Sequence, residues 1–217
     1  ATAAAGHSLG EYAAMVYTGM VSRTDGFKLI KARSLAMQKA AENSSGAMFA
    51  IIGSTPADIE KVCAETEGYV VPVNYNSSVQ TVIAGEEAAA DTLAAAGARA
   101  IRLNVAAAFH SKLMQGAADE FKPAAEQISF KTPEITMLSN ISGTVLDSID
   151  NMPERLALHI VSPVKFTSEL AYLSENGYDT FIECGPGKVL TGLVKKTLKG
   201  VNAMNVQDAD TLAKVIG

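Results

Sequence analysis

Two periods of hydrophobic and polar positions alternate along the 217-residue chain. Short apolar runs rich in Val, Ile and Ala predict β-strands, and longer stretches with apolar residues three or four positions apart predict amphipathic helices. The two kinds of segment follow each other from one end of the sequence to the other, which is typical of an α/β protein. No internal repeat and no low-complexity tract interrupts this pattern.

The middle of the sequence predicts a unit of its own. Its expected elements, in order, are a strand at 47–52, a helix after Pro56 to about Thr66, strands at 70–75 and 81–84, a helix at about 86–95 and a strand at about 98–105. This βαββαβ order is typical of the ferredoxin-like pattern. We therefore expect residues 46–106 to form a ferredoxin-like subdomain inserted into a larger α/β body, formed by residues 1–45 and 107–217.

The flanking sequence predicts the elements of that body. One expected helix lies at 10–19, and a second runs from a cap at Thr24 or Asp25 to about Asn43. Further helices are expected at about 111–127, at 153–159 and at 167–175. The last one follows the glycines at 185–187 and ends at about Leu198. The expected strands lie at 135–139, 180–183 and 202–206. Thr and Asp are favoured caps because their side-chain oxygens accept a hydrogen bond from an amide of the first turn.

Composition narrows the classes of partner. Eighteen Lys and Arg residues against 23 Asp and Glu residues give a net charge of −5, which argues against a general nucleic-acid binder. No apolar run approaches the length that a membrane-spanning helix needs, so we expect no membrane partner. Cys63 and Cys184 have neither zinc nor redox spacing. We therefore expect reduced thiols, no bound metal and a cytoplasmic protein.

The segment Gly6-His7-Ser8-Leu9-Gly10 matches the nucleophile elbow G-x-S-x-G. We expect both glycines to be required, because the turn is sharp and neighbouring backbone passes close to it. The Leu9 N–H is then a candidate oxyanion donor. The plainer interpretation is a glycine-flanked serine that caps a helix. Only Ala1–Ala5 precede the motif, and five small residues make a poor strand, so we expect the domain to begin upstream of Ala1.

An activated serine needs a base, and the sequence offers His7, His110 and His159. His7 lies inside the turn and is expected to point away from Ser8. His159 ends a predicted helix among apolar residues. His110 lies in the loop between the last strand of the insert and the next helix, and α/β folds present catalytic groups on such loops. We therefore favour His110 as the base.

Arg33 shares one predicted helix face with Ile30, Met37 and Ala40, which are all apolar. An arginine on such a face is costly unless its guanidinium meets an anion. One interpretation is a structural ion pair, for instance with Glu11, and spacing alone favours it. The other is a bidentate clamp for a substrate carboxylate.

An ordered set of motifs runs over nearly the whole chain. They are Gly-His-Ser-Leu-Gly-Glu-Tyr at 6–12, Arg33 with Met37 and Gln38, Gly46-Ala47-Met48, Asn74-Tyr75-Asn76-Ser77, Val82-Ile83-Ala84-Gly85, Phe109-His110-Ser111, Ser162-Pro163-Val164 and Glu-Cys-Gly-Pro-Gly-Lys-Val-Leu-Thr-Gly at 183–192. Together they resemble the malonyl-CoA:acyl-carrier-protein transacylase family. The resemblance implies an α/β-hydrolase-like, parallel-sheet body with a ferredoxin-like insert.

The resemblance also implies residue roles. Ser8 would be the acylated nucleophile, His110 its base, Arg33 the group that binds the free malonyl carboxylate, and Leu9 the source of an oxyanion N–H. Phe109 and Leu9 match the malonyl-selective variants of their positions.

Two departures from the family pattern bear on this chain. His159 stands where the family often has Gln, at the position implied to orient the catalytic histidine through its backbone carbonyl. The family also begins with a strand and a Gly-Gln-Gly-Ser-Gln loop that supplies the second oxyanion N–H, and neither is in this sequence. We therefore expect that an N-terminal segment is missing from this sequence and that it acts as a partner of the chain. Without that segment we expect the chain to be poorly active.

The implied reaction transfers malonyl from malonyl-CoA to the phosphopantetheine thiol of acyl carrier protein, in fatty-acid biosynthesis, with no metal or other cofactor. Three alternatives remain: a serine thioesterase or other hydrolase, an acyltransferase domain of a polyketide synthase, and an inactive fragment that binds carrier protein. Lys195, Lys196 and Lys199 form either an ordinary solvated helix face or a docking patch for the acidic carrier protein.

Overall fold

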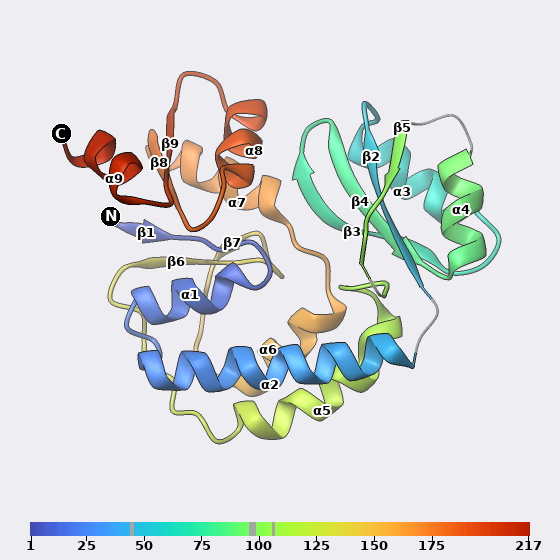
Figure 1. Ribbon diagram of the computed structural model, residues 1–217, viewed down its shortest axis with the longest axis horizontal. Coiled ribbons are helices and arrows are strands. Elements are labelled where there is room, and N and C mark those ends of the chain that lie inside the picture. The colour runs from blue at the N-terminus through green and yellow to red at the C-terminus, as the bar shows by residue number, and fades with distance from the viewer. Residues whose placement is uncertain (44–45, 96–98, 106) are drawn as a thin grey trace.

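A computed structural model describes residues 1–43, 46–95, 99–105 and 107–217 (Figure 1). The predicted domain boundaries at residues 45 and 106, and the predicted strand start at Ala98, lie outside these residues. The fold is mixed α/β, as the alternating pattern predicts. None of the helices in the described ranges is long and apolar enough to cross a membrane.

The N-terminal strand, the elbow and most of the helices form one part of the molecule. Strand β1 (Ala3–Ala4) pairs in parallel with β6 (Thr136–Ser139), and β7 (Thr144–Val145) pairs antiparallel with β6. Four helices lie along one side of these strands (Figure 1): α1 (Gly10–Tyr17), α2 (Arg23–Glu42), α5 (Gln115–Ala125) and α6 (Met152–Val161). Their apolar faces meet in the largest core cluster, which includes Tyr12, Leu29 and Phe121.

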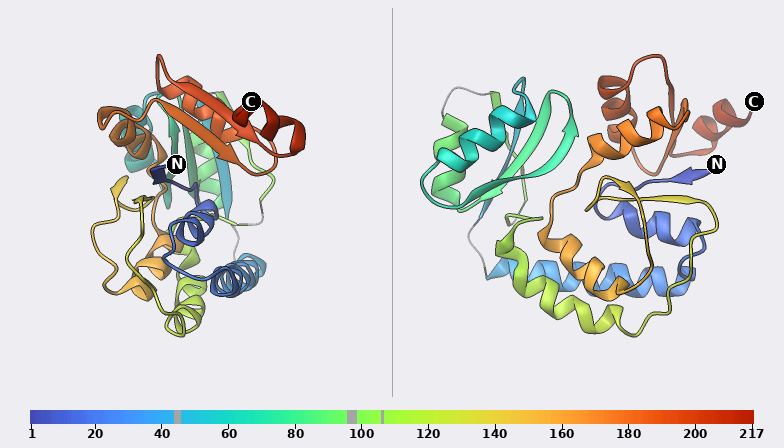
Figure 2. Two further views of the ribbon diagram at one scale, coloured as in Figure 1. Left: turned by 90° about the vertical axis from the view of Figure 1, so that its left-hand side faces the viewer. Right: turned by 180° about the vertical axis from the view of Figure 1, so that it is seen from behind.

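A four-stranded antiparallel sheet forms a second part, which lies beside the first in Figure 1 and in the right-hand view of Figure 2. Its strand order is β3 (Val70–Ser77), β4 (Gln80–Gly85), β2 (Ala47–Ile52), β5 (Arg99–Arg102). Helices α3 (Pro56–Glu65) and α4 (Glu87–Ala95) join its strands in the order βαββαβ.

The two faces of this sheet have different neighbours, because successive side chains of a strand point to opposite sides. Phe49 and Ile51 pack in one cluster with Ile59 of α3. Met48, in the alternate register, packs on the other face with Ala108 and the partly buried Phe109. The sheet thereby supports the segment that carries His110.

The C-terminal residues form a third group of elements. It contains α7 (Phe166–Glu175), the parallel pair β8 (Thr180–Cys184) and β9 (Asn202–Val206), the intervening α8 (Val189–Thr197) and the final α9 (Ala209–Ile216). The chain between α6 and α7 joins this group to the four-stranded sheet. Val164 N–H donates to the Val73 carbonyl at 2.8 Å, and Tyr75 N–H donates to the Val164 carbonyl at 2.9 Å.

Three local expectations need correction. Helix α2 begins earlier than predicted, because Ser22, rather than Thr24 or Asp25, accepts the capping bond from Asp25 N–H. The predicted helix at 111–127 begins as a 3₁₀ turn, Lys112–Met114, with Ser111 accepting from Leu113 N–H. Helix α9 is not predicted at all, although Asp208 and Thr211 form a capping box at its start.

Candidate active site

The elbow carries Ser8 between β1 and α1. Ser8 has a φ of +53°, in the left-handed region that non-glycine residues rarely adopt. A Cβ atom on Gly6 would overlap backbone atoms of Gly10 and Glu11, so this glycine is required. The expectation that Gly10 is also required is wrong, because a Cβ atom there would meet nothing within 4 Å.

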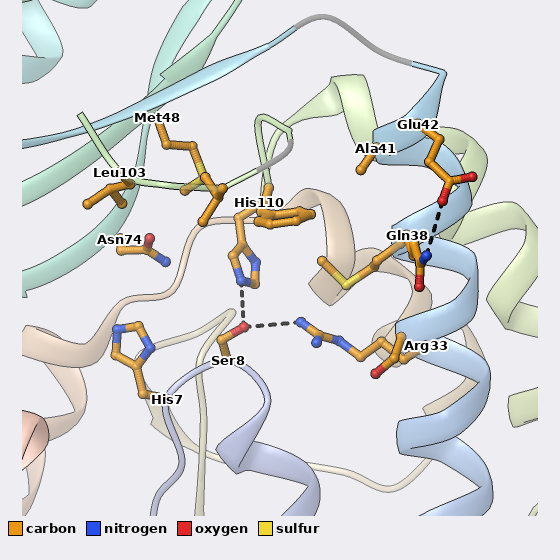
Figure 3. Close-up of a pocket in the computed structure, with 14 residues that line it drawn as sticks. His7, Ser8, Arg33, Gln38, Ala41, Glu42, Met48, Asn74, Leu103 and His110 are labelled. Carbon is orange, nitrogen blue, oxygen red and sulfur yellow. Dashed lines mark hydrogen bonds between the residues drawn. The ribbon is translucent and has the colours of Figure 1, made fainter. Parts of the chain in front are cut away.

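The side chains of His110 and Ser8 face each other (Figure 3). Its Nε2 lies 2.7 Å from Ser8 Oγ, and its Nδ1 lies 3.1 Å from the carbonyl oxygens of both His159 and Ser162. Carbonyl oxygens only accept hydrogen bonds, so Nδ1 carries the proton and Nε2 is left as the acceptor for the Ser8 hydroxyl. The two backbone carbonyls therefore fix the tautomer that a general base needs.

The protonation state of His110 also suits a base. The ring is 4% exposed, and burial lowers its pKa to about 4, with the nearby positive charge of Arg33 acting in the same direction. The imidazole is therefore neutral at neutral pH and able to accept a proton.

The other two histidines, His7 and His159, also lie near Ser8 and His110. His7 and Ser8 both line one cleft, which the sequence did not predict (Figure 3). The His7 Nε2 lies 2.7 Å from Asn76 Oδ1 of β3, so its hydrogen bond is directed away from Ser8, in agreement with the sequence. The His159 side chain is fully buried on α6 and does not line the cleft. Its backbone carbonyl accepts from His110 Nδ1, and its ring centre lies 5.4 Å from that of His110.

Arg33 projects from α2 toward the serine (Figure 3). One terminal nitrogen donates to Ser8 Oγ at 3.1 Å, and the guanidinium carbon lies 5.5 Å from the centre of the Tyr12 ring. The side chain is 4% exposed, and burial lowers the pKa of Arg33. Within the described residues it forms no ion pair, with Glu11 or any other acid, and its Nε has no hydrogen-bond partner. A buried cation without a fixed counter-ion thus lies beside the hydroxyl.

The cleft around these groups has a volume of about 680 Å³. Helix α2, the elbow, the four-stranded sheet and the His110 segment supply its walls, which include Met37, Met48, Asn74, Leu103 and Phe109. Leu9 is not among the lining residues. It is largely exposed at the start of α1, and its N–H donates to no acceptor among the described residues.

The family model described as "Acyl transferase domain" matches residues 1–216. The malonyl CoA-acyl carrier protein transacylase of Escherichia coli strain K12 is 37% identical over 219 aligned residues, which cover 98% of this chain and 71% of that protein. The chain belongs to the malonyl CoA-acyl carrier protein transacylase family. The resemblance seen in the sequence motifs is therefore confirmed.

Solved structures of other transacylases share the fold. The malonyl CoA-acyl carrier protein transacylase of Clostridium perfringens ATCC 13124 superposes with a TM-score of 0.93 at 37% identity, over 98% of this chain and 69% of that one. A malonyl-transacylase solved in complex with a type II PKS acyl-carrier protein superposes with a TM-score of 0.91 at 35% identity, over 98% of this chain and 71% of that one.

Two further features of this transacylase-family chain bear on its site. Asn140 accepts a hydrogen bond from the Ser8 amide at 2.7 Å, and sequence reasoning missed it. No pattern around Asn140 marks it, since its partner lies 132 residues away.

Lys195, Lys196 and Lys199 are exposed at the end of α8 and just after it, and none forms an ion pair with a described residue. Their docking role remains a prediction.

Proposed function

We propose that this chain transfers a malonyl group from malonyl-CoA to the phosphopantetheine thiol of an acyl carrier protein, through a malonyl ester of Ser8, in fatty-acid biosynthesis. Membership of the transacylase family supports the activity. One observation about the site carries the assignment of roles: Ser8 Oγ lies within hydrogen-bond distance of both a neutral imidazole and a buried cation, His110 and Arg33.

Acylation uses these two groups and the elbow amide. His110 Nε2 removes the hydroxyl proton as Ser8 Oγ attacks the thioester carbonyl of malonyl-CoA. Negative charge then develops on the carbonyl oxygen, and the Leu9 N–H is the proposed donor that stabilises it. The C–S bond breaks, His110 returns the proton to the departing sulfur, and coenzyme A leaves with its thiol restored.

The second half-reaction reverses these roles. The carrier-protein thiol gives its proton to His110, and its sulfur attacks the ester carbonyl of malonyl-Ser8. The C–O bond to Ser8 breaks, and the proton on His110 passes to Ser8 Oγ. In both halves the imidazolium is transient, and the carbonyl oxygens of His159 and Ser162 stabilise it through the Nδ1 proton.

Arg33 is the proposed clamp for the free malonyl carboxylate. A planar guanidinium binds a carboxylate through two parallel hydrogen bonds. The lack of an ion pair to Glu11 or any other described acid favours this role over the structural one. Phe109, which lines the same cleft, is proposed to shape the acyl pocket.

We also propose that residues 46–106 form a ferredoxin-like insert in an α/β-hydrolase-like body formed by residues 1–45 and 107–217. The strand order β3-β4-β2-β5 and the βαββαβ connectivity support the insert. The parallel pairing of β1 with β6, and the elbow between β1 and α1, support the body. This arrangement puts the cleft between the two parts.

The acceptor decides between a transferase and a hydrolase. Malonyl-CoA is supplied with holo acyl carrier protein or with buffer alone, and malonyl-carrier and free malonate are both quantified. We expect the carrier to be malonylated much faster than malonate is released. Equal release of malonate with and without the carrier would favour the hydrolase. The same assay with a type II polyketide carrier tests the alternative pathway. The related malonyl-transacylase that was solved with such a carrier is the reason for this test.

A further inference from the structure

Asn140 lies where the chain leaves β6, one residue beyond the strand. Strand β6 pairs in parallel with β1, so the two strands end at the same edge. The elbow follows β1, and Asn140 therefore lies directly beside it. Its side chain is completely buried.

The side-chain amide of Asn140 makes four hydrogen bonds. Its Nδ2 donates to the Gly6 carbonyl at 2.6 Å and to Glu169 Oε1 at 2.8 Å. Its Oδ1 accepts from the Ser8 amide at 2.7 Å and lies 3.2 Å from His159 Nε2. Both amide hydrogens and both oxygen lone pairs are therefore used.

The orientation of this amide is fixed by its partners. The Gly6 carbonyl only accepts and the Ser8 N–H only donates, so turning the amide over would put two acceptors and two donors face to face. The Asn140 backbone is held too, because its N–H donates to Glu11 Oε2 at 3.1 Å and its carbonyl accepts from Lys165 N–H at 3.0 Å.

The acids around Asn140 do not bring a pair of negative charges into the core. Burial raises the pKa of Glu169 well above its usual range and raises that of Glu11 to about 7. A neutral Glu169 on α7 still offers Oε1 to the amide. Burial also keeps the pKa of His159 well below its usual value, so its ring is neutral and donates from Nε2.

The elbow needs such support on both sides. Ser8 adopts a left-handed backbone conformation that is strained for a residue with a side chain. One asparagine side chain holds the carbonyl of Gly6 before the turn and the amide of Ser8 at the turn itself. Rotation of that peptide segment would carry Ser8 Oγ away from His110 Nε2.

We infer that Asn140 is a positioning residue for acyl transfer, because it holds the elbow in the conformation that points Ser8 Oγ at His110 and Arg33. It touches neither the substrate nor the reacting atoms. A merely structural role predicts that its replacement changes stability alone. The positioning role predicts that it changes the reactivity of Ser8 in protein that is still folded.

The chain offers suitable variants. Asn140→Leu has a similar size and makes no hydrogen bond. Asn140→Asp keeps one oxygen for the Ser8 amide. Ser139→Ala is the control, because Ser139 is the neighbouring, fully buried residue and its hydroxyl has no partner among the described residues. Each variant of the full chain is treated with a fluorophosphonate, which forms a phosphonyl ester with an activated serine and releases fluoride. Labelling of Ser8 is followed by mass spectrometry, and folding by thermal unfolding.

We expect Asn140→Leu to slow labelling of Ser8 by about 10²-fold, because a small displacement of the nucleophile costs that much. The labelling rate of Asn140→Asp should stay within about tenfold of the wild-type rate, and that of Ser139→Ala should equal the wild-type rate. Malonyl transfer should show the same pattern in kcat, with little change in KM. Folded Asn140→Leu that labels at the wild-type rate would overturn the inference.

Amide hydrogen exchange at Ser8 covers the case in which Asn140→Leu does not fold. The Ser8 amide of wild type should exchange slowly, and faster in Asn140→Asp than in Ser139→Ala. Fast exchange at Ser8 in wild type would contradict the Asn140 contact. Because this role presupposes acyl transfer through Ser8, the outcomes separate: no labelling of wild-type Ser8 removes the proposed function and this inference together, whereas equal labelling of wild type and Asn140→Leu removes the inference alone.

Discussion

Ser8 Oγ lies 2.7 Å from His110 Nε2, although 102 positions separate the two residues in sequence. Each has a positive φ, +53° for Ser8 and +61° for His110, so both sides of this contact are held in a backbone conformation that side chains disfavour. Such strain persists only where the surroundings impose it. Hydrogen bonds to both residues and packing around the His110 segment supply those constraints.

The pH dependence of Ser8 reactivity tests the state of His110. The base works only when neutral, and burial together with Arg33 lowers its pKa to about 4. Reactivity should therefore hold as the pH falls through 6.5 and decline only near 4. A fluorophosphonate is a suitable reagent because it does not titrate in this range. His110→Ala should lower the rate by roughly 10²–10⁴-fold. A midpoint near 6.5 would show a solvent-exposed histidine instead.

Replacement of Arg33 tests the selectivity for malonyl over acetyl groups. Arg33→Ala should lower the ratio of kcat/KM for malonyl-CoA over acetyl-CoA by about 10²-fold, since hydrogen bonds between charged groups are lost for malonyl alone. Arg33→Lys should restore the ratio only in part, because an ammonium lacks the planar fork. If Arg33→Ala lowers both substrates equally, Arg33 has a structural role.

The two glycines of the elbow give a matched pair. Gly6→Ala should lower the free energy of unfolding by about 2 kcal/mol or more and abolish labelling of Ser8, because the new Cβ overlaps the backbone of Gly10 and Glu11. Gly10→Ala should be close to wild type in both, because its Cβ enters open space. Urea unfolding and fluorophosphonate labelling measure the two effects. Equal damage from both substitutions would contradict the geometry of the turn.

The exposed lysines near the end of α8 test carrier-protein docking. Joint replacement of Lys195, Lys196 and Lys199 by Glu should raise KM for the acidic carrier protein by roughly tenfold. The effect should shrink as salt is added, because surface charges are screened. Lys131→Glu is the control, as an exposed lysine after α5 with no described ion pair. An equal rise in KM for malonyl-CoA, or no rise at all, would remove this patch.

Much of the fold follows from local sequence pattern. The strands at 47–52 and 202–206 are predicted with their observed bounds. Helix starts are less well predicted because several capping residues lie close together: Ser22 competes with the predicted Thr24 and Asp25 at α2. Helix α9 was not predicted, although Asp208 caps its start.

The sequence likewise predicts some residues of the site and not others. The elbow motif and the uncommon placement of Arg33 on an apolar helix face single out two residues from sequence. Long-range contacts leave no such trace. The four partners of the Asn140 side chain come from three separate segments, and no period or motif in the sequence brings them together. His7 shows the same limit, since its adjacency to Ser8 in sequence did not reveal that both line one cleft.

Transfer through a malonyl ester requires that malonyl-CoA acylates the Ser8 hydroxyl. Single-turnover incubation of the chain with malonyl-CoA, acid quenching and peptide mass spectrometry test it directly. We expect a malonyl ester on the peptide that contains Ser8, absent from Ser8→Ala and removed when holo acyl carrier protein is added before the quench. Absence of the ester from wild type, or an ester of equal yield in Ser8→Ala, would show that Ser8 is not the acylated residue.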